Sequence, residues 1–230
     1  MLFVKNSCHF NQKCYTEIKN INLIEWLYDI LKKDGLTIEL LTSLSFKSKL
    51  NHSLKRTLRH FDKQAIFKEL QEVNEWYDLN ENLHDILIDY RIKSLQSAYQ
   101  KYHRYPLNRP LAKVFNDLLG FRTLCDNYED ILSLSQDSNI YIVDMSKGKS
   151  NDDGYRGVHI YFQLSNYHYP IEVQYNTYYD RQLNNWLHKY VYKKNFPNSI
   201  GITLREKYEQ GCIQNETIFK EVLSHVLSNS

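Results

Sequence analysis

Two runs of alternating apolar and polar residues lie between residues 156 and 175, and they constrain the fold more than any other feature of the chain. The first run is RGVHIYFQL and the second is YPIEVQY, and a short Ser-Asn-Tyr connection joins them. Side chains alternate across a strand, so the apolar residues of both runs can share one face and the polar residues the other. The spacing therefore predicts an antiparallel β-hairpin with its apolar face on the core.

The polar face of this hairpin would carry functional groups in the middle of its strands. One strand contributes His159, its neighbour contributes Glu172 and Gln174, and Arg156 lies at the start of the first run. Antiparallel sheets commonly expose one face to water, so a solvated surface is the simpler interpretation of the hairpin alone. The alternative interpretation is that this polar face forms half of an active site. The hairpin alone does not distinguish the two interpretations.

The apolar pattern divides the chain into a helical first part and a strand-rich second part. Helical spacing continues to about residue 105, with apolar stripes at 23–31 and 46–61, whereas FRTLC and NIYIVDM add two strands. Three further helices are expected, at about 128–133, at about 178–192 and after residue 215. With 42% hydrophobic residues the chain can bury a core. Helices followed by an antiparallel-rich sheet with helices predict an α+β fold.

Composition and cysteine usage exclude several classes of protein. The net charge of +2 is too small to predict a nucleic-acid partner by itself. The cysteines lack the C-x-x-C pairing of zinc sites and predict reduced thiols in the cytosol: Cys8, Cys14, Cys125 and Cys212. No signal peptide or membrane span is expected, which predicts a cytoplasmic protein with no membrane partner.

Two carboxylates stand out because each lies at or inside a predicted strand. Asp117 precedes the apolar run of NDLLGFR, and Glu172 lies within IEVQY. A lone acid at the start of a strand is most often a turn residue or a helix cap. Two carboxylates on neighbouring strands would instead make a magnesium site, since Mg²⁺ takes oxygen ligands and often combines one or two carboxylates with substrate phosphates. Spacing alone leaves both interpretations open.

A cationic stripe is predicted on a helix over residues 89–105, DYRIKSLQSAYQKYHRY. At helical spacing, one face would carry Lys93, Ser97, Lys101 and Arg104. A solvated lysine face is the simpler interpretation of this stripe. Cations and hydroxyls are also what a triphosphate requires, so a polyphosphate cradle is the alternative.

Four motifs in this order resemble the synthetase domain of the RelA/SpoT family. They are R-x-K-S-x-x-S-x-x-x-K, D-L-x-G-x-R, G-Y-R-x-x-H and E-V-Q, and the resemblance covers roughly Tyr90 to Lys193. It implies a nucleotidyltransferase-like mixed β-sheet flanked by helices, with an N-terminal helical region and a C-terminal helix. It also implies an enzyme that moves pyrophosphate from ATP to the 3′-hydroxyl of an acceptor, using Mg²⁺.

The resemblance implies a role for each motif residue. Asp117 and Glu172 would hold the metal, and Glu172 would also draw the proton from the attacking hydroxyl. The ATP-binding residues would be two arginines around the adenine and three residues on the phosphates: Arg91 and Arg122, then Lys93, Ser97 and Lys101. The acceptor-binding residues would be a tyrosine on the base and two residues on the ribose or phosphate: Tyr155, then His159 and Gln174. Arginine and tyrosine both stack on planar rings, in agreement with these roles.

The chain departs from the alarmone-making pattern at one position. Members that make guanosine tetra- and pentaphosphate typically continue E-V-Q with I-R-T, whereas this chain has Tyr175-Asn176-Thr177. The chain has no room for the hydrolase and regulatory domains of the long family members. We therefore expect a small stand-alone synthetase without hydrolase activity. Its expected parts are an N-terminal helical region at 1–84, a synthetase core at 85–200 and a C-terminal helical tail at 201–230.

Small stand-alone members of the family differ in their acceptor. Some make an alarmone from GDP or GTP, and others are toxins of toxin–antitoxin systems, many of which place pyrophosphate on the 3′-CCA end of tRNA. YRGVHIYF and YNTYYDRQLNNWLHKYVYKK resemble the toxic small alarmone synthetase branch, so tRNA is the preferred acceptor and an antitoxin an expected partner. GDP or GTP is the alternative acceptor, and an inactive nucleotide- or RNA-binding module is the alternative of another class.

Two further stretches of the sequence are candidates for contact with a partner molecule. A basic helix predicted between residues 47 and 63 would contact a tRNA backbone through Lys55, Arg56 and Arg59, or would simply present the polar face of an amphipathic helix. The apolar stripe at 218–227 would dock an antitoxin, form a contact between copies or cover the domain's own core. The pattern alone does not choose among these alternatives.

Overall fold

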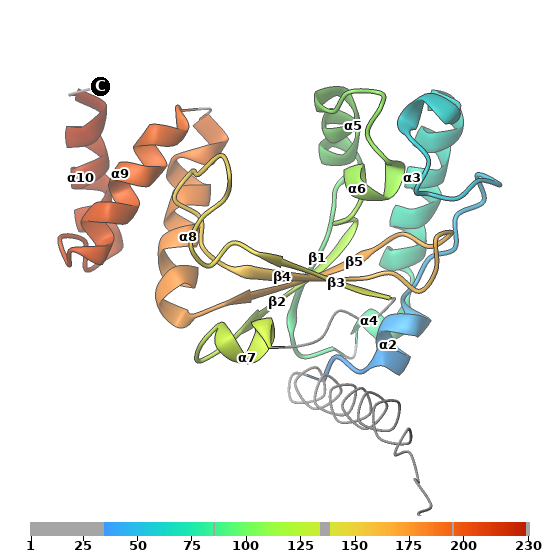
Figure 1. Ribbon diagram of the computed structural model, residues 1–230, viewed down its shortest axis with the longest axis horizontal. Coiled ribbons are helices and arrows are strands. Elements are labelled where there is room, and N and C mark those ends of the chain that lie inside the picture. The colour runs from blue at the N-terminus through green and yellow to red at the C-terminus, as the bar shows by residue number, and fades with distance from the viewer. Residues whose placement is uncertain (1–34, 85, 134–138, 195, 229–230) are drawn as a thin grey trace, which may run out of the picture.

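A five-stranded mixed sheet crosses the middle of the molecule in the computed structural model, which describes residues 35–84, 86–133, 139–194 and 196–228 (Figure 1). The strand order is β1-β2-β5-β4-β3, with β2 and β5 parallel and the other neighbours antiparallel. The strands are β1 Asp89–Ile92, β2 Leu119–Leu124, β3 Ile140–Asp144, β4 Val158–Phe162 and β5 Ile171–Asn176. The helix expected at 23–31 lies outside the described residues.

Helices cover both faces of this sheet. Figure 1 shows α5 and α6 above one end of the sheet and α8 to α10 above the other, with α2, α4 and α7 below. The helices are α2 Ile38–Ser43, α3 Lys63–Asp78, α4 Glu81–His84, α5 Leu95–Arg104, α6 Leu111–Val114, α7 Glu129–Leu132, α8 Tyr178–Tyr190, α9 Asn198–Glu209 and α10 Glu216–Ser228. Short 3₁₀ turns are η1 Leu58–His60 and η2 Tyr192–Lys194. The predicted α+β fold with a mixed sheet and flanking helices is confirmed.

The predicted hairpin is formed by β4 and β5. Its apolar residues pair across the strands, Ile160 with Val173 and Phe162 with Ile171, and all four are buried. The connection spans residues 163–170 and is therefore longer than the three-residue link expected from the sequence. The backbone N–H groups of Ser48 and Leu54 donate to this connection, so an early segment of the chain holds it in place.

Two apolar clusters hold the molecule together. The larger cluster joins α2 to α6 to the apolar face of the sheet, and the smaller one joins α8, α9 and α10. Phe219 and Leu223 of α10 are buried in the smaller cluster, so the apolar stripe at the C-terminus covers the domain's own core. Residue 200, where the predicted synthetase core ends, lies inside α9. No helix in the described part of the chain is long and apolar enough to cross a membrane.

The prediction of one helix over residues 89–105 was wrong for its first part. Asp89 to Ile92 form β1, which pairs with β2 along four residues. Helix α5 begins only at Leu95, because the hydroxyl of Ser94 accepts a hydrogen bond from the backbone N–H of Ser97 and caps the helix. The D-Y-R-I segment alternates between exposed and half-buried side chains, which is the period of a strand rather than of a helix.

The prediction of a basic helix between residues 47 and 63 was also wrong. This segment is irregular apart from η1, and it runs beside residues 107–112 through the bridge between Thr57 and Pro110. Leu54 and Leu58 are buried as their spacing implied, but long-range backbone hydrogen bonds fix them, including one from Leu58 N–H to the carbonyl of Arg109 at 3.0 Å. Tertiary pairing has therefore overridden the local helical pattern.

Candidate active site

The strand register arranges the polar side chains of the sheet in two neighbouring rows on one face. One row across the five strands is Arg91, Gly120, Glu172, Tyr161 and Tyr141. The next row toward α8 is Asp89, Arg122, Gln174, His159 and Val143. Because residues two apart along a strand point to the same face, both rows form one surface. This surface brings together residues of all four sequence motifs.

The glycine of the second motif leaves room for a carboxylate. Gly120 lies opposite Glu172 in the parallel pair of β2 and β5. A Cβ atom at Gly120 would lie 3.3 Å from Oε2 of Glu172, which is closer than most side chains allow. The absence of a side chain at this position therefore leaves room for the Glu172 carboxylate in its row.

Glu172 is 7% exposed, and both of its carboxylate oxygens form hydrogen bonds. Its Oε1 lies 3.0 Å from Nδ1 of His159 and accepts from the Tyr161 hydroxyl at 2.8 Å, and its Oε2 accepts from Nε2 of Gln174 at 2.7 Å. Burial alone would raise the pKa of Glu172, but the hydrogen bond and charge of His159 outweigh burial and hold the pKa below its ordinary value. The side chain is therefore an ionised carboxylate with fixed orientation.

Asp117 lies between α6 and β2 and is held by two lysines. Nζ of Lys93 is 2.7 Å from Oδ2, and Nζ of Lys101 is 2.9 Å from Oδ1. Burial would raise the pKa of Asp117, but the charges of Lys101 and Lys93 outweigh burial and lower it. The lysines reach this carboxylate from opposite ends of the predicted cationic stripe, one just before α5 and one on its last turn.

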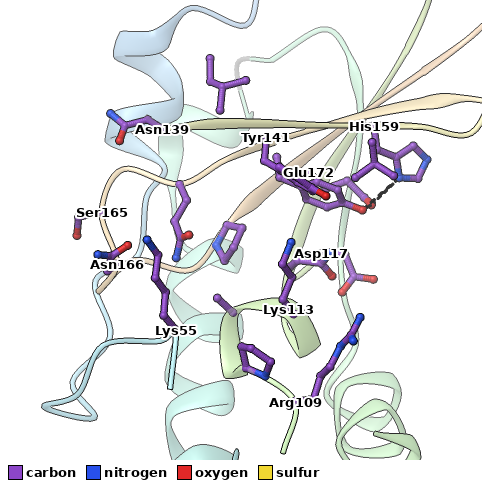
Figure 2. A pocket seen from close by; sticks show the side chains of 18 of the residues that line it. Lys55, Arg109, Lys113, Asp117, Asn139, Tyr141, His159, Ser165, Asn166 and Glu172 are labelled. Carbon is purple, nitrogen blue, oxygen red and sulfur yellow. Dashed lines mark hydrogen bonds and ion pairs between the residues drawn. The ribbon is translucent and has the colours of Figure 1, made fainter. Parts of the chain in front are cut away.

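Both carboxylates open into one cavity of about 900 Å³, together with His159 (Figure 2). Asp117 and Glu172 therefore share one cleft, as two ligands of one metal ion would have to. The described residues contain no group of three or more His, Cys, Asp or Glu side chains that could hold a metal. Two ionised carboxylates nevertheless fit Mg²⁺, which commonly completes its shell with phosphate oxygens and water.

The two motif arginines lie on the half of the polar face that β1 and β2 form. Arg91 is on β1 and Arg122 on β2, where Arg122 is 3.9 Å from Asp89. His188 on α8 is close enough that burial, then the charges of Lys193, Arg122 and Arg91, lower its pKa. This half of the face is therefore strongly cationic.

Arg181, also on α8, belongs to the same cationic surface. Burial, followed by the charge of Arg122, lowers the pKa of Arg181. Its guanidinium donates to the carbonyl of Thr123 at 3.0 Å, and among the described residues its buried Nε has no hydrogen-bond partner. The motifs did not include Arg181 or His188, although their spacing of seven residues places both on one face of a helix.

Ser97 lies in the first turn of α5, where its hydroxyl accepts from the hydroxyl of Ser94 at 2.9 Å. It does not line the cavity, whereas Lys101 does. The first motif thus supplies two lysines at Asp117 and two hydroxyls at a helix N-terminus, where backbone N–H groups and the helix dipole favour anions.

The segment Asp152–Gly157 carries Tyr155 and is anchored from several sides. The Tyr155 hydroxyl lies 2.7 Å from Nε2 of His159, and Nζ of Lys149 lies 4.7 Å from the Tyr155 ring centroid. Nε of Arg205 on α9 donates to the carbonyl of Gly154 at 2.9 Å. Tyr155, His159 and Glu172 consequently form one continuous line of contacts.

Asn176 occupies the position where the resemblance in sequence implies an arginine in members that make alarmones. It is 2% exposed, and its Nδ2 donates to the carbonyl of Arg156 at 2.8 Å and to the hydroxyl of Tyr155 at 3.4 Å. Gly157 leaves room for this amide, because a Cβ atom at Gly157 would lie 2.5 Å from Nδ2 of Asn176. Asn176 therefore supports the Tyr155 segment and presents no charge to the cleft.

The three basic residues predicted near an RNA backbone divide between two environments. Lys55 lines the cavity, whereas Arg56 and Arg59 are exposed outside it. The cavity also contains Arg109 and Lys113, which no sequence motif indicated. They become neighbours of Lys55 only because residues 54–59 pair with 107–112.

Residues 90–196 match the model of a region found in RelA/SpoT proteins. This match covers the stretch over which the sequence motifs resemble that family. Similar solved structures include small alarmone synthetase 1 from Bacillus subtilis bound to its product pppGpp, with 20% identity, a TM-score of 0.38 and coverage of 71% of this chain and 88% of that chain. Another is a GTP pyrophosphokinase family protein from Streptococcus pneumoniae, with 17% identity, a TM-score of 0.36 and coverage of 72% and 88%. No curated protein matches the chain.

Proposed function

We propose that this protein transfers the pyrophosphate group of ATP to a 3′-hydroxyl, and that its acceptor is the 3′-CCA end of tRNA. In this proposal it is a translation-inhibiting toxin of a toxin–antitoxin system. The observation that carries the transferase is the convergence of Asp117 and Glu172, both held ionised, on one cavity. The RelA/SpoT region at 90–196 supports the same reaction class.

The cationic half of the polar face is the proposed ATP site. Arg91 and Arg122 would hold the adenine between them, since guanidinium groups stack on planar rings. Lys93, Ser97 and Lys101 would bind the phosphates. The two lysines now contact Asp117, so this role requires them to turn from the carboxylate to the incoming phosphates.

Asp117 and Glu172 would hold Mg²⁺, which when bound neutralises charge on the transferring phosphates. The protein's own part is to position the reactants and to manage one proton. The 3′-oxygen of the acceptor forms a bond to the β-phosphorus of ATP, the bond from this phosphorus to the α–β bridging oxygen breaks, and AMP leaves. The proton of the 3′-hydroxyl passes to the carboxylate of Glu172, whose lowered pKa keeps it ionised and ready to accept.

The acceptor would lie on the β4 side of Glu172. Tyr155 would stack on the acceptor base, and His159 and Gln174 would hold its ribose or phosphate, which their contacts with Glu172 support. The tRNA preference is supported by Asn176, which is buried where an arginine is typical of alarmone makers. GDP or GTP remains the second candidate acceptor, because Tyr155, His159 and Gln174 form a continuous set beside Glu172.

An antitoxin is the proposed protein partner in this function. The stripe of α10 is not available to it, since Phe219 and Leu223 are buried against α8 and α9. Expression of the protein without a partner should therefore arrest growth, and Glu172→Gln should relieve the arrest. Growth arrest by Glu172→Gln equal to that by the parent protein would argue against the enzymatic toxin.

The acceptor is tested with ATP labelled at the β or the γ position and offered GDP, GTP or bulk tRNA. Pyrophosphate carries both outer phosphorus atoms, so either label should appear on tRNA. Glu172→Gln should abolish the transfer, whereas Glu221→Gln, a matched change on exposed α10, should not alter it. Label on guanosine nucleotides alone would overturn the tRNA assignment. Absence of transfer to every acceptor, with ATP still bound, would identify an inactive nucleotide-binding module.

A further inference from the structure

The cavity extends beyond the proposed reaction centre to a wall that the transfer step does not use. We call it the cationic wall, and it consists of Lys55, Arg109, Lys113 and Tyr141. Figure 2 shows these side chains at separate places around the cavity that holds Glu172. They come from three parts of the chain, which are the segment before η1, the region of α6 and strand β3. The tertiary fold therefore brings these side chains together around one cavity.

The described part of the chain supplies no counter-charge to the cations of this wall. Asp117 and Glu172 are the acidic residues that line the cavity, and both are engaged elsewhere. Within the described ranges, no carboxylate forms a salt bridge with Lys55, Arg109 or Lys113. Three uncompensated cations around one cavity favour a ligand with several negative charges.

An aromatic ring lies among these cations. Tyr141 is 47% exposed on the edge strand β3, and Nζ of Lys113 lies 4.1 Å from its ring centroid. A ring beside a cation is the arrangement that binds single-stranded nucleic acid, since the ring stacks on a base and the cation contacts the adjoining phosphate. Stacking of this kind tolerates any base, because every base has a π face.

The positive charge also continues out of the cavity. Residues 55–59 run antiparallel to 107–111, with a hydrogen bond from Arg59 N–H to the carbonyl of Leu107 at 3.0 Å. Arg56 and Arg59 are exposed on this paired segment. A nucleoside diphosphate needs cations that converge on one point, whereas a row of cations leading away from a cavity suits an extended phosphate backbone.

We infer that the cationic wall binds the phosphodiester backbone, and one base, of the nucleotides that precede the 3′-terminal nucleotide of an RNA acceptor. This inference rests on the proposed function, since it takes the terminal 3′-hydroxyl to lie at Glu172. The wall distinguishes a polynucleotide end from a free nucleotide, because a free nucleotide has no backbone to reach it. The ligand class is therefore single-stranded RNA with a free 3′ end.

The test measures binding of a fluorescent RNA hairpin ending in CCA by anisotropy over a series of salt concentrations. Arg109→Gln/Lys113→Gln should weaken binding about tenfold or more and should reduce the slope of log K against log salt by about 0.7 per phosphate contact removed. Tyr141→Leu should weaken binding with an unchanged slope. Lys220→Gln, on exposed α10, is the matched control and should bind as the parent does. Circular dichroism checks that each variant is folded.

A kinetic measurement on the same variants separates this inference from the proposed function. Arg109→Gln/Lys113→Gln should raise KM for RNA and leave KM for ATP and for GDP unchanged. RNA binding and salt slope equal to those of Lys220→Gln would overturn the inference. So would a rise in KM for GDP alone, which would assign the wall to the 5′-phosphates of a nucleotide. If the parent binds RNA as expected but transfers nothing, the proposed function fails while the RNA site stands.

Discussion

The backbone of Gly154 packs directly against the backbone of Gly201 in α9. A Cβ atom at Gly154 would lie 2.2 Å from the carbonyl oxygen of Gly201, and one at Gly201 would lie 1.9 Å from the carbonyl oxygen of Asp153. Both distances are shorter than any real contact, so only glycine allows the two segments to meet. Helix α9 thereby fixes the segment that carries Tyr155.

We predict that Gly201→Ala displaces this segment. Alanine ordinarily stabilises a helix relative to glycine by about 1 kcal/mol, but here its methyl group meets a backbone oxygen that cannot rotate away. The clash should outweigh the helix gain, lower the melting temperature and raise KM for the acceptor more than KM for ATP. Calorimetry and steady-state kinetics measure the two effects. Ser199→Ala, an exposed change on the same helix, should do neither.

His159 is predicted to keep Glu172 ionised in acid. The hydrogen bond and charge of His159 lower the pKa of Glu172 against the effect of burial, so the carboxylate stays charged as pH falls through the ordinary range of glutamate near 4.3. In His159→Gln this pKa should rise, and the acidic limb of the kcat/KM profile should move to higher pH. His225→Gln, on exposed α10, should leave the profile in place. An unshifted limb in His159→Gln would contradict the assignment.

The same shift has a consequence for stability. Because the folded-state pKa of Glu172 is lower than its unfolded value, its contribution is present above the unfolded pKa and is lost as pH falls through the folded pKa. His159→Gln should therefore reduce the difference in free energy of unfolding between neutral and acidic pH. Urea denaturation at several pH values measures this difference.

Local periodicity was sufficient to predict one half of the site. The β4–β5 hairpin followed from alternation alone, since the apolar pairs had to share the core face and thereby placed His159 beside Gln174. Helix α8 and the stripe of α10 were predictable for the same reason. Resemblance to a family supplied the roles, which no spacing could supply.

The other half depends on pairings that local patterns do not encode. Asp117 shares a cavity with Glu172 only because β2 pairs in parallel with β5, which lies far along the chain. Lys93 and Lys101 have helical spacing, but one follows a strand and the other lies on the last turn of α5, so a single helix does not explain why both contact Asp117. Arg109 and Lys113 could not be found at all, because the pairing of 54–59 with 107–112 creates their cavity wall.

Competition between lysines and metal at Asp117 gives a further prediction. Lys93 and Lys101 occupy both carboxylate oxygens, so Mg²⁺ alone should bind weakly and ATP should strengthen its binding by drawing the lysines away. Lys93→Met/Lys101→Met should bind Mg²⁺ without ATP more tightly than the parent, which titration calorimetry measures directly. Lys189→Met removes an exposed lysine that pairs with Glu216 and serves as the control. Equal affinity of all three proteins would show that Asp117 does not bind the metal.

Outside the cleft, we predict that substitution of Arg205 lowers the free energy of unfolding more than any other single substitution. It is 1% exposed, its guanidinium lies 2.6 Å from Oδ1 of Asp180, and it holds the carbonyl of Gly154. Breaking a buried pair leaves a charge without a partner, so Arg205→Met should lower the free energy of unfolding by about 3–5 kcal/mol.

A substitution of Asp180 tests whether Arg205 stabilises the protein through its ion pair or through packing. Its Oδ2 accepts from the hydroxyls of Tyr128 and Thr177, so Asp180→Asn keeps a polar group of the same shape at this position. The double variant Arg205→Met/Asp180→Asn should recover part of the stability lost in Arg205→Met, because no unpaired charge remains buried. Urea denaturation of the parent, the two single variants and the double variant gives the coupling free energy. A coupling near zero would mean that Arg205 acts through packing and its bond to Gly154 alone.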